Sequence, residues 1–99
     1  MYCYIWEFRV DAEHDAEFRA AYGDAGEWVA LFRRDPHYIR TELLRDRDDP
    51  SRYLTIDYWT SREACLSFRA TFETEFESID RKYEAITQRE TPLGEFELI

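Results

Sequence analysis

The residue whose type and setting best suit it for chemistry is Asp57, an acidic residue within an aromatic and aliphatic segment. Residues 52–59 alternate with the two-residue period of a β-strand, so Asp57 shares one strand face with Tyr53, Thr55 and Trp59. A carboxylate on a central strand is costly to bury without a partner, because removal from water penalises its charged form. The pattern therefore predicts either a salt-bridged carboxylate or a proton acceptor held in a functional site.

The other ionisable residues offer fewer options. Arg40 and Arg9 are the candidate ion-pair partners of this carboxylate, although alternation alone places Arg9 on the opposite face of the sheet. His14 and His37 fall at polar cap and loop positions, where solvated side chains are expected. No acidic, histidine or cysteine cluster has the spacing of a metal site, so we predict no metal ligands and no metal cofactor.

Aromatic side chains are predicted to surround Asp57. Residues 2–10 also alternate, which puts one set of rings on the same face of a neighbouring strand: Tyr4, Trp6 and Phe8. Further rings would come from the helices: Trp28 from a short one, and Phe68 and Phe72 from a long one. Together with Thr55, these residues are the predicted ligand-binding set, an apolar pocket for a flat hydrophobic molecule. Ordinary core packing predicts the same placement for any single ring.

Four segments have strand patterns and would position these residues. They are residues 2–10, 38–45, 52–59 and 95–99, and a polar hairpin loop, Asp48–Ser51, joins the second to the third.

Three helical segments separate the strands. Asp11 is the predicted N-cap of a short helix that ends near Gly23, and Asp24 opens a further turn or two. Thr60–Glu63 has the pattern of a capping box, and one long amphipathic helix is expected from Cys65 to Ile86.

The resulting order is β-α-α-β-β-α-β, which predicts an α+β fold: one ferredoxin-like sandwich domain over residues 1–99, with the helices on one face of an antiparallel sheet. The other face would carry apolar side chains, namely Cys3, Ile5, Ile39, Leu43, Leu54, Ile56 and Tyr58. The helices cannot reach that face, and an apolar surface of this size needs a cover. We therefore expect a homodimer, paired through the surface around Ile5, Leu54 and Ile56.

Composition restricts the partners. The net charge is −9, with 13 basic and 22 acidic residues and no basic cluster, which argues against nucleic acid and against anionic membranes. No apolar run approaches the length of a membrane span, and no signal-peptide pattern opens the chain. Cys3 and Cys65 are too few for a disulfide scaffold, so two free thiols and a cytoplasmic location are expected.

Two long stretches of the sequence resemble a known family. They are the segment from Tyr4 to Phe32, with Trp6-Glu-Phe8 and Gly26-Glu-Trp28, and the segment from Tyr38 to Ala64, with Asp57-Tyr-Trp59. They are similar to antibiotic-biosynthesis monooxygenase domains. The resemblance covers nearly the whole chain and implies a dimeric α+β barrel.

The resemblance also implies an activity. Such enzymes oxidise phenolic or polycyclic aromatic molecules to quinones without a metal or flavin, because the substrate anion itself reacts with dioxygen. On this reading the catalytic residues would be Asp57 as base, Tyr53 as hydrogen-bond partner and Trp59 as ring-positioning group. The alternative is a non-catalytic small-molecule-binding or stress-related protein with the same dimeric barrel.

The haem-degrading branch of the same family places an asparagine on the first strand and a histidine on the last helix. Those two positions hold Phe8 and Phe68 here. An apolar ring neither binds iron nor donates a hydrogen bond, so we expect no haem cofactor.

Overall fold

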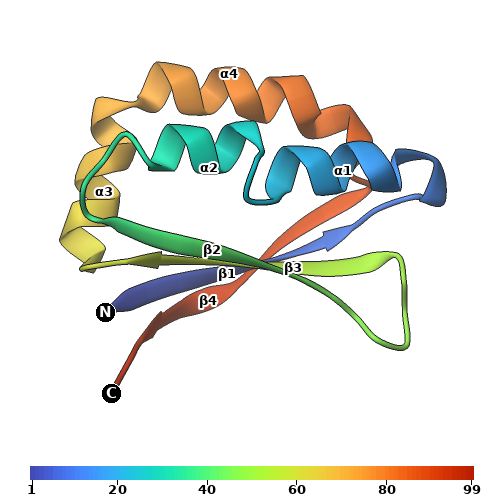
Figure 1. Ribbon diagram of the computed structural model, residues 1–99, viewed down its shortest axis with the longest axis horizontal. Coiled ribbons are helices and arrows are strands. Elements are labelled where there is room, and N and C mark those ends of the chain that lie inside the picture. The colour runs from blue at the N-terminus through green and yellow to red at the C-terminus, as the bar shows by residue number, and fades with distance from the viewer.

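One antiparallel sheet carries all the helices on a single face (Figure 1). The computed structural model describes residues 1–99. Its strands are β1 (Tyr2–Arg9), β2 (Tyr38–Arg45), β3 (Arg52–Trp59) and β4 (Arg89–Glu97), in the sheet order β2-β3-β1-β4. Its helices are α1 (Asp15–Tyr22), α2 (Glu27–Phe32), α3 (Arg62–Thr71) and α4 (Glu73–Tyr83), with 3-10 turns at Ala12–His14 and Glu84–Ile86. The predicted α+β ferredoxin-like class is confirmed.

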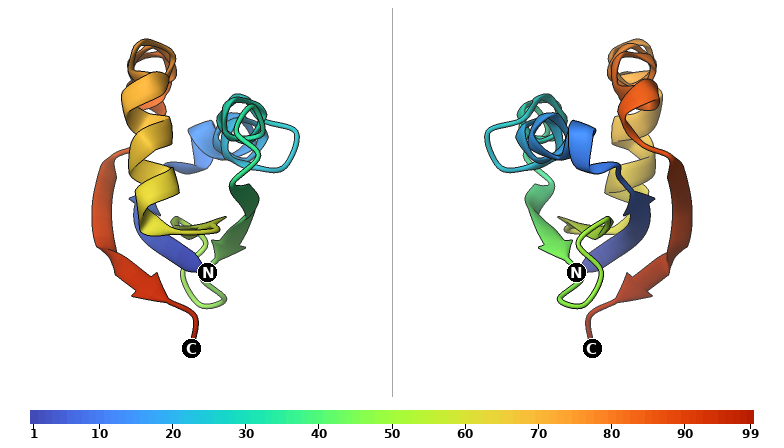
Figure 2. Two further views of the ribbon diagram at one scale, coloured as in Figure 1. Left: turned by 90° about the vertical axis from the view of Figure 1, so that its left-hand side faces the viewer. Right: turned by 90° about the vertical axis from the view of Figure 1, so that its right-hand side faces the viewer.

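The pairing of β1 with β3 determines which side chains meet beneath the helices. In this antiparallel register Tyr4 lies opposite Asp57 and Trp6 lies opposite Thr55. Along β3, buried residues alternate with half-buried ones, as the two-residue period requires. Figure 2 shows the sheet curving beneath two groups of helices, α1 with α2 on one side and α3 with α4 on the other.

A bulge in β2 corrects one prediction about the outer face of the sheet. The register of β2 against β3 shifts between Tyr38 and Arg40, which changes the alternation of every later residue. Leu43 consequently pairs with Thr55 and packs against the core, so its predicted position on the outer face is wrong. Leu44 takes the outward position instead and is 43% exposed.

The predicted long helix is wrong in one respect, because it consists of two helices, α3 and α4, that meet at Phe72. There the backbone leaves the α-helical region (φ −108°, ψ 28°). The ladder of backbone hydrogen bonds nevertheless continues, from Phe72 N to Phe68 O and from Phe76 N to Phe72 O, both at 2.9 Å. The interruption is therefore a bend, and the apolar stripe continues across it.

The start of α3 also differs from prediction by one residue. Ser61, and not Thr60, is the N-cap, and its Oγ accepts a hydrogen bond from the Ala64 backbone N–H at 3.1 Å. We expect Ser61→Ala to lower the free energy of unfolding by about 1 kcal/mol, because one backbone donor of the first turn loses its partner. Thr60→Ala serves as the control and should be nearly neutral. Urea unfolding of both variants measures the difference, and an equal loss in the two would contradict this cap assignment.

The last strand is longer than predicted. The sequence favoured a strand from residue 95, but β4 begins at Arg89 and includes Pro92 and Gly94. A bulge accommodates both, since Ile5 pairs with Gly94 and Trp6 with Pro92. Gly94 has φ 147°, which side-chain-bearing residues rarely adopt, and Pro92 is tolerated because β4 is an edge strand.

None of the helices has the length and apolar character needed to cross a bilayer.

Candidate active site

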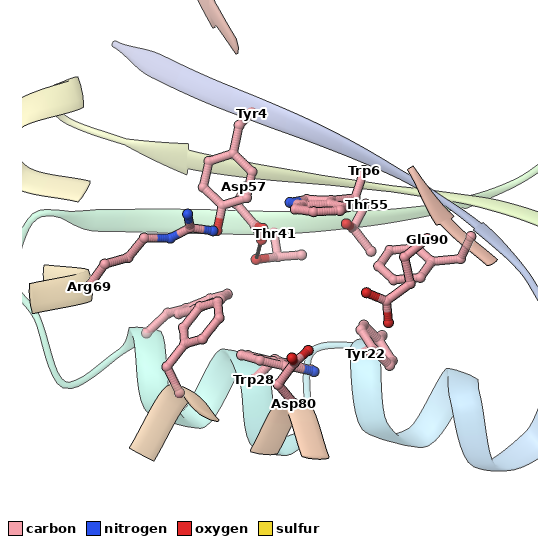
Figure 3. A pocket seen from close by; sticks show the side chains of 13 residues that line it. Tyr4, Trp6, Tyr22, Trp28, Thr41, Thr55, Asp57, Arg69, Asp80 and Glu90 are labelled. Atoms are coloured by element: carbon pink, nitrogen blue, oxygen red, sulfur yellow. Dashed lines mark hydrogen bonds between the residues drawn. The ribbon is translucent and has the colours of Figure 1, made fainter. Parts of the chain in front are cut away.

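A cavity of about 250 Å³ lies between the sheet and the helices. Six of the ten predicted site residues line it: Tyr4, Trp6, Phe8, Trp28, Thr55 and Asp57. The strands supply the upper wall, and the helices supply the lower wall (Figure 3). This volume is just below the usual range of ligand pockets, about 300 to 1,000 Å³, so the cavity suits a compact, flat molecule.

Asp57 is the most deeply buried acid among the lining residues, and its side chain is 5% exposed. Thr41 Oγ1 donates a hydrogen bond to its Oδ1 at 2.5 Å, and the Tyr38 and Thr41 hydroxyls are in turn 2.7 Å apart. Burial raises the pKa of Asp57 from 3.8 to about 6, and hydrogen bonds from Thr41 and Tyr4 and the charge of Arg69 oppose that rise. A carboxyl group with such a pKa can both accept and return a proton near neutral pH.

Neither of the ion-pair partners suggested by the sequence contacts Asp57. Arg9 instead forms an ion pair with Asp49 in the hairpin loop. Arg40 lies on the outer face, with its guanidinium 4.2 Å from the centre of the Tyr58 ring. Both lie away from the cavity because of strand alternation and the β2 bulge. The carboxyl group is thus satisfied by hydroxyl groups rather than by a salt bridge.

Tyr4 completes this polar end of the cavity. Its side chain is 8% exposed, and burial together with the charge of Asp57 holds its pKa well above the usual value for tyrosine. Tyr4 therefore remains protonated at physiological pH and can only act as a hydrogen-bond donor or acceptor there.

Two more acidic side chains face the cavity. Asp80 from α4 and Glu90 from β4 line it, and both side chains are exposed. The pKa of the Glu90 carboxyl group is raised, first by partial burial and then by the negative charge of Asp80. Figure 3 shows Asp80 beside Trp28 on the helix side of the cavity, across from the strand that carries Asp57, and Glu90 toward Tyr22.

Four of the predicted site residues do not line the cavity. Tyr53 is 2% exposed and donates a hydrogen bond to Asp15. Trp59 is fully buried. The centre of its ring lies 5.9 Å from the ring centre of Phe32, which lines the cavity. Phe68 packs between Trp59 and Phe72, with ring centres 4.9 and 5.0 Å away, and thus belongs to the core behind the wall.

The structure also brings in residues that sequence reasoning missed, namely Tyr22, Phe32, Thr41, Arg69, Phe76, Asp80 and Glu90. Arg69 had a usable signal, because it lies at helical spacing within the series 65, 69, 72 and 76. Thr41 had none, because its position opposite Asp57 depends on the β2 bulge.

Known proteins resemble this chain in sequence and in structure. Over 49 residues it is 37% identical to deoxynogalonate monooxygenase of Streptomyces nogalater; the match spans 50% of this chain and 39% of that protein, well under half of the relative's length. A variant of SnoaB, a cofactor-independent oxygenase from Streptomyces nogalater, aligns with TM-score 0.71 and 27% identity over 98% of this chain and 91% of that one. A Pseudomonas aeruginosa protein shares the fold, with TM-score 0.70 and 18% identity over 99% and 93% of the two chains.

The model of one family, antibiotic biosynthesis monooxygenase, matches residues 1–82. That range includes β1 to β3 and almost all of the two helices that follow, and so nearly every cavity-lining residue described above. The chain belongs to the antibiotic biosynthesis monooxygenase family.

Proposed function

We propose that this protein is a cofactor-independent monooxygenase that oxidises a phenolic or polycyclic aromatic molecule. The observation that carries the proposal is Asp57, a deeply buried carboxyl group with a pKa of about 6 at one end of an aromatic cavity. Its placement gives the cavity a base whose pKa suits proton removal near neutral pH. Resemblance to SnoaB, a cofactor-independent oxygenase, supports the same activity.

The proposed reaction begins with proton transfer. Asp57 takes a proton from the substrate, and the resulting anion passes electrons to dioxygen. A carbon–oxygen bond forms, the peroxide is protonated, and loss of water leaves a ring carbonyl. One oxygen atom of dioxygen is then in the quinone and the other is in water. Trp6, Phe8 and Trp28 would hold the ring system in place and exclude water.

The roles assigned from the sequence to Tyr53 and Trp59 become indirect in this proposal. Tyr53 would anchor β3 to α1 through Asp15. Trp59 would support Phe32 and with it the cavity wall. Phe68 and Phe72 would do the same from α3 and from the bend that follows it. The hydrogen-bonding role assigned to Tyr53 passes to Thr41 and Tyr4, which lie beside Asp57.

A non-catalytic binding protein is the second candidate function. The aromatic part of the lining favours it, because seven of the thirteen lining residues are hydrophobic and could hold a flat ligand without any chemistry. Oxygen uptake separates the two functions. We expect hydroxyanthrones or naphthols to be consumed with uptake of dioxygen, and label from ¹⁸O₂ to enter the quinone. Quenching of tryptophan fluorescence without oxygen uptake would favour the binding protein, and the absence of both signals would contradict both functions.

We also propose that the protein forms a homodimer through the outer sheet face. Ile5 and Ile56 are paired there in the register of β1 and β3, only half-buried, with no helix above them. A stable interface of this kind buries roughly 1,200 to 2,000 Å² in total. Ile56→Glu should therefore yield a monomer in sedimentation velocity at micromolar concentration. The control is Leu66→Glu, at an exposed position on α3, which should remain dimeric; a monomeric parent protein would contradict the proposal.

A further inference from the structure

Arg69 occupies a position that its contacts do not explain. It projects from α3, and its guanidinium lies 5.3 Å from the ring centre of Tyr4 and 5.0 Å from that of Phe76. Its Nε is buried and has no hydrogen-bond partner. No ion pair joins it to a carboxylate, although acidic residues outnumber basic ones in this protein. A buried donor without a partner normally costs stability, and a ligand that accepts from this group would remove that cost.

The charges around the cavity are arranged unevenly along its length. Arg69 is the only cationic side chain that lines it, and Figure 3 shows its guanidinium reaching toward Tyr4 and Asp57. The carboxylates of Asp80 and Glu90 also line it, Asp80 on the helix side beside Trp28 and Glu90 toward Tyr22. An anion in the cavity would thus be attracted toward Arg69 and repelled by Asp80 and Glu90.

Arg69 also borders a second hollow. An open groove between α3 and β4 shares three lining residues with the cavity: Tyr4, Trp6 and Arg69. The rings of Tyr4 and Phe76 hold the guanidinium at this boundary without neutralising its charge. Its donors therefore remain available to a molecule inside the cavity.

We propose that Arg69 binds the ionised oxygen of the aromatic substrate and so orients that oxygen toward Asp57. This assignment rests on the proposed function. When the phenolic O–H bond breaks, the proton moves to an Asp57 carboxylate oxygen and both bonding electrons stay on the substrate oxygen. The new negative charge then lies beside the guanidinium, which donates charge-assisted hydrogen bonds to it. The preferred substrate is therefore an acidic phenol or enol whose other end carries no negative charge.

The test uses 4-nitro-1-naphthol, whose ionised form absorbs at longer wavelength than its neutral form. At a pH where the free compound is mainly neutral, we expect the parent protein to bind it with the absorbance of the ionised form. Arg69→Met should weaken binding about tenfold and return the bound spectrum toward the neutral form. Arg69→Lys keeps the positive charge and should restore part of the ionised signal. The charges that face the ligand are those of Asp57, Asp80, Glu90 and Arg69.

Arg62→Met is the matched control. Arg62 lies on the same helix, pairs with Glu95 and does not line the cavity, so this variant should bind and ionise the naphthol as the parent does. Binding of the neutral form by the parent protein would overturn the assignment of Arg69 and leave the proposed function standing. An unchanged ionised spectrum in Arg69→Met would do the same. No binding of the naphthol by the parent would overturn both proposals.

Discussion

Replacing Asp57 with asparagine should lower turnover by orders of magnitude and at the same time make the protein more stable at pH 8. In the folded state burial raises the pKa of this carboxyl group from 3.8 to about 6, so at pH 8 folding holds a charge out of water. A rise of roughly two units corresponds to about 3 kcal/mol, because each unit is worth about 1.4 kcal/mol. Asparagine is neutral at every pH and avoids this cost.

The direction of the pH dependence follows from the raised pKa. The protonated carboxyl group contributes its stabilisation fully below about pH 4, and this contribution is lost as the pH rises through about 6. The variant and the parent should therefore unfold with equal free energy near pH 4, diverge as the pH rises from about 4 to 6, and differ by a constant amount at higher pH. Urea unfolding at a series of pH values measures the difference. Asp48→Asn, at an exposed position in the hairpin loop, is the control.

Turnover should respond in the opposite sense. A base with this pKa gives a parent rate that rises through about pH 6. Asp57→Asn should lower the rate by about 10²- to 10⁴-fold while ligand binding persists, as is usual when a general base is lost. A variant that is less stable at pH 8 and retains its turnover would contradict the assignment of Asp57 as base.

The second large effect is expected at Trp59, and it concerns stability rather than binding. Trp59 is fully buried, and its ring contacts those of Phe32, Tyr38 and Phe68. Trp59→Ala should cost about 3 to 5 kcal/mol of unfolding free energy, because it leaves a large cavity in the core. Trp59→Phe should cost about 1 to 2 kcal/mol. Guanidinium unfolding measures both.

Trp6→Phe provides the comparison for ligand binding. Trp6 is only half-buried and lines the cavity, so its replacement should weaken naphthol binding with a small change in stability. Calorimetric titration of both phenylalanine variants separates the two roles. A loss of affinity in Trp59→Phe that exceeds the loss in Trp6→Phe would show that Trp59 shapes the site more directly than its position behind Phe32 suggests.

The strands and the helix order could be predicted because their signals are local. Two-residue alternation identified β1 and β3, and thus the shared face on which Tyr4 and Asp57 meet. The β2 bulge could not be predicted, because a bulge inserts one residue without a marker of its own in the segment. Thr41 was missed as the partner of Asp57 for that reason.

Residues from the helices were harder to place. An amphipathic stripe shows which residues face the sheet, but it does not separate those that reach a cavity from those that fill the core. Phe68 and Arg69 are adjacent in sequence, yet the phenylalanine packs behind the wall and the arginine lines it. The bend at Phe72 changes the direction of the helix and hence which side chains reach inward.

The irregular β4 has a consequence for how copies of this protein can associate. An edge strand normally presents free backbone groups that can pair with a strand of another molecule. Here Pro92 supplies no N–H, and the bulge beside Gly94 interrupts the regular spacing of the remaining groups. Continuous extension of the sheet past this edge is thereby disfavoured. Protection from open-ended strand addition is thus built into β4, which accords with the closed, pairwise contact proposed for the outer face of the sheet.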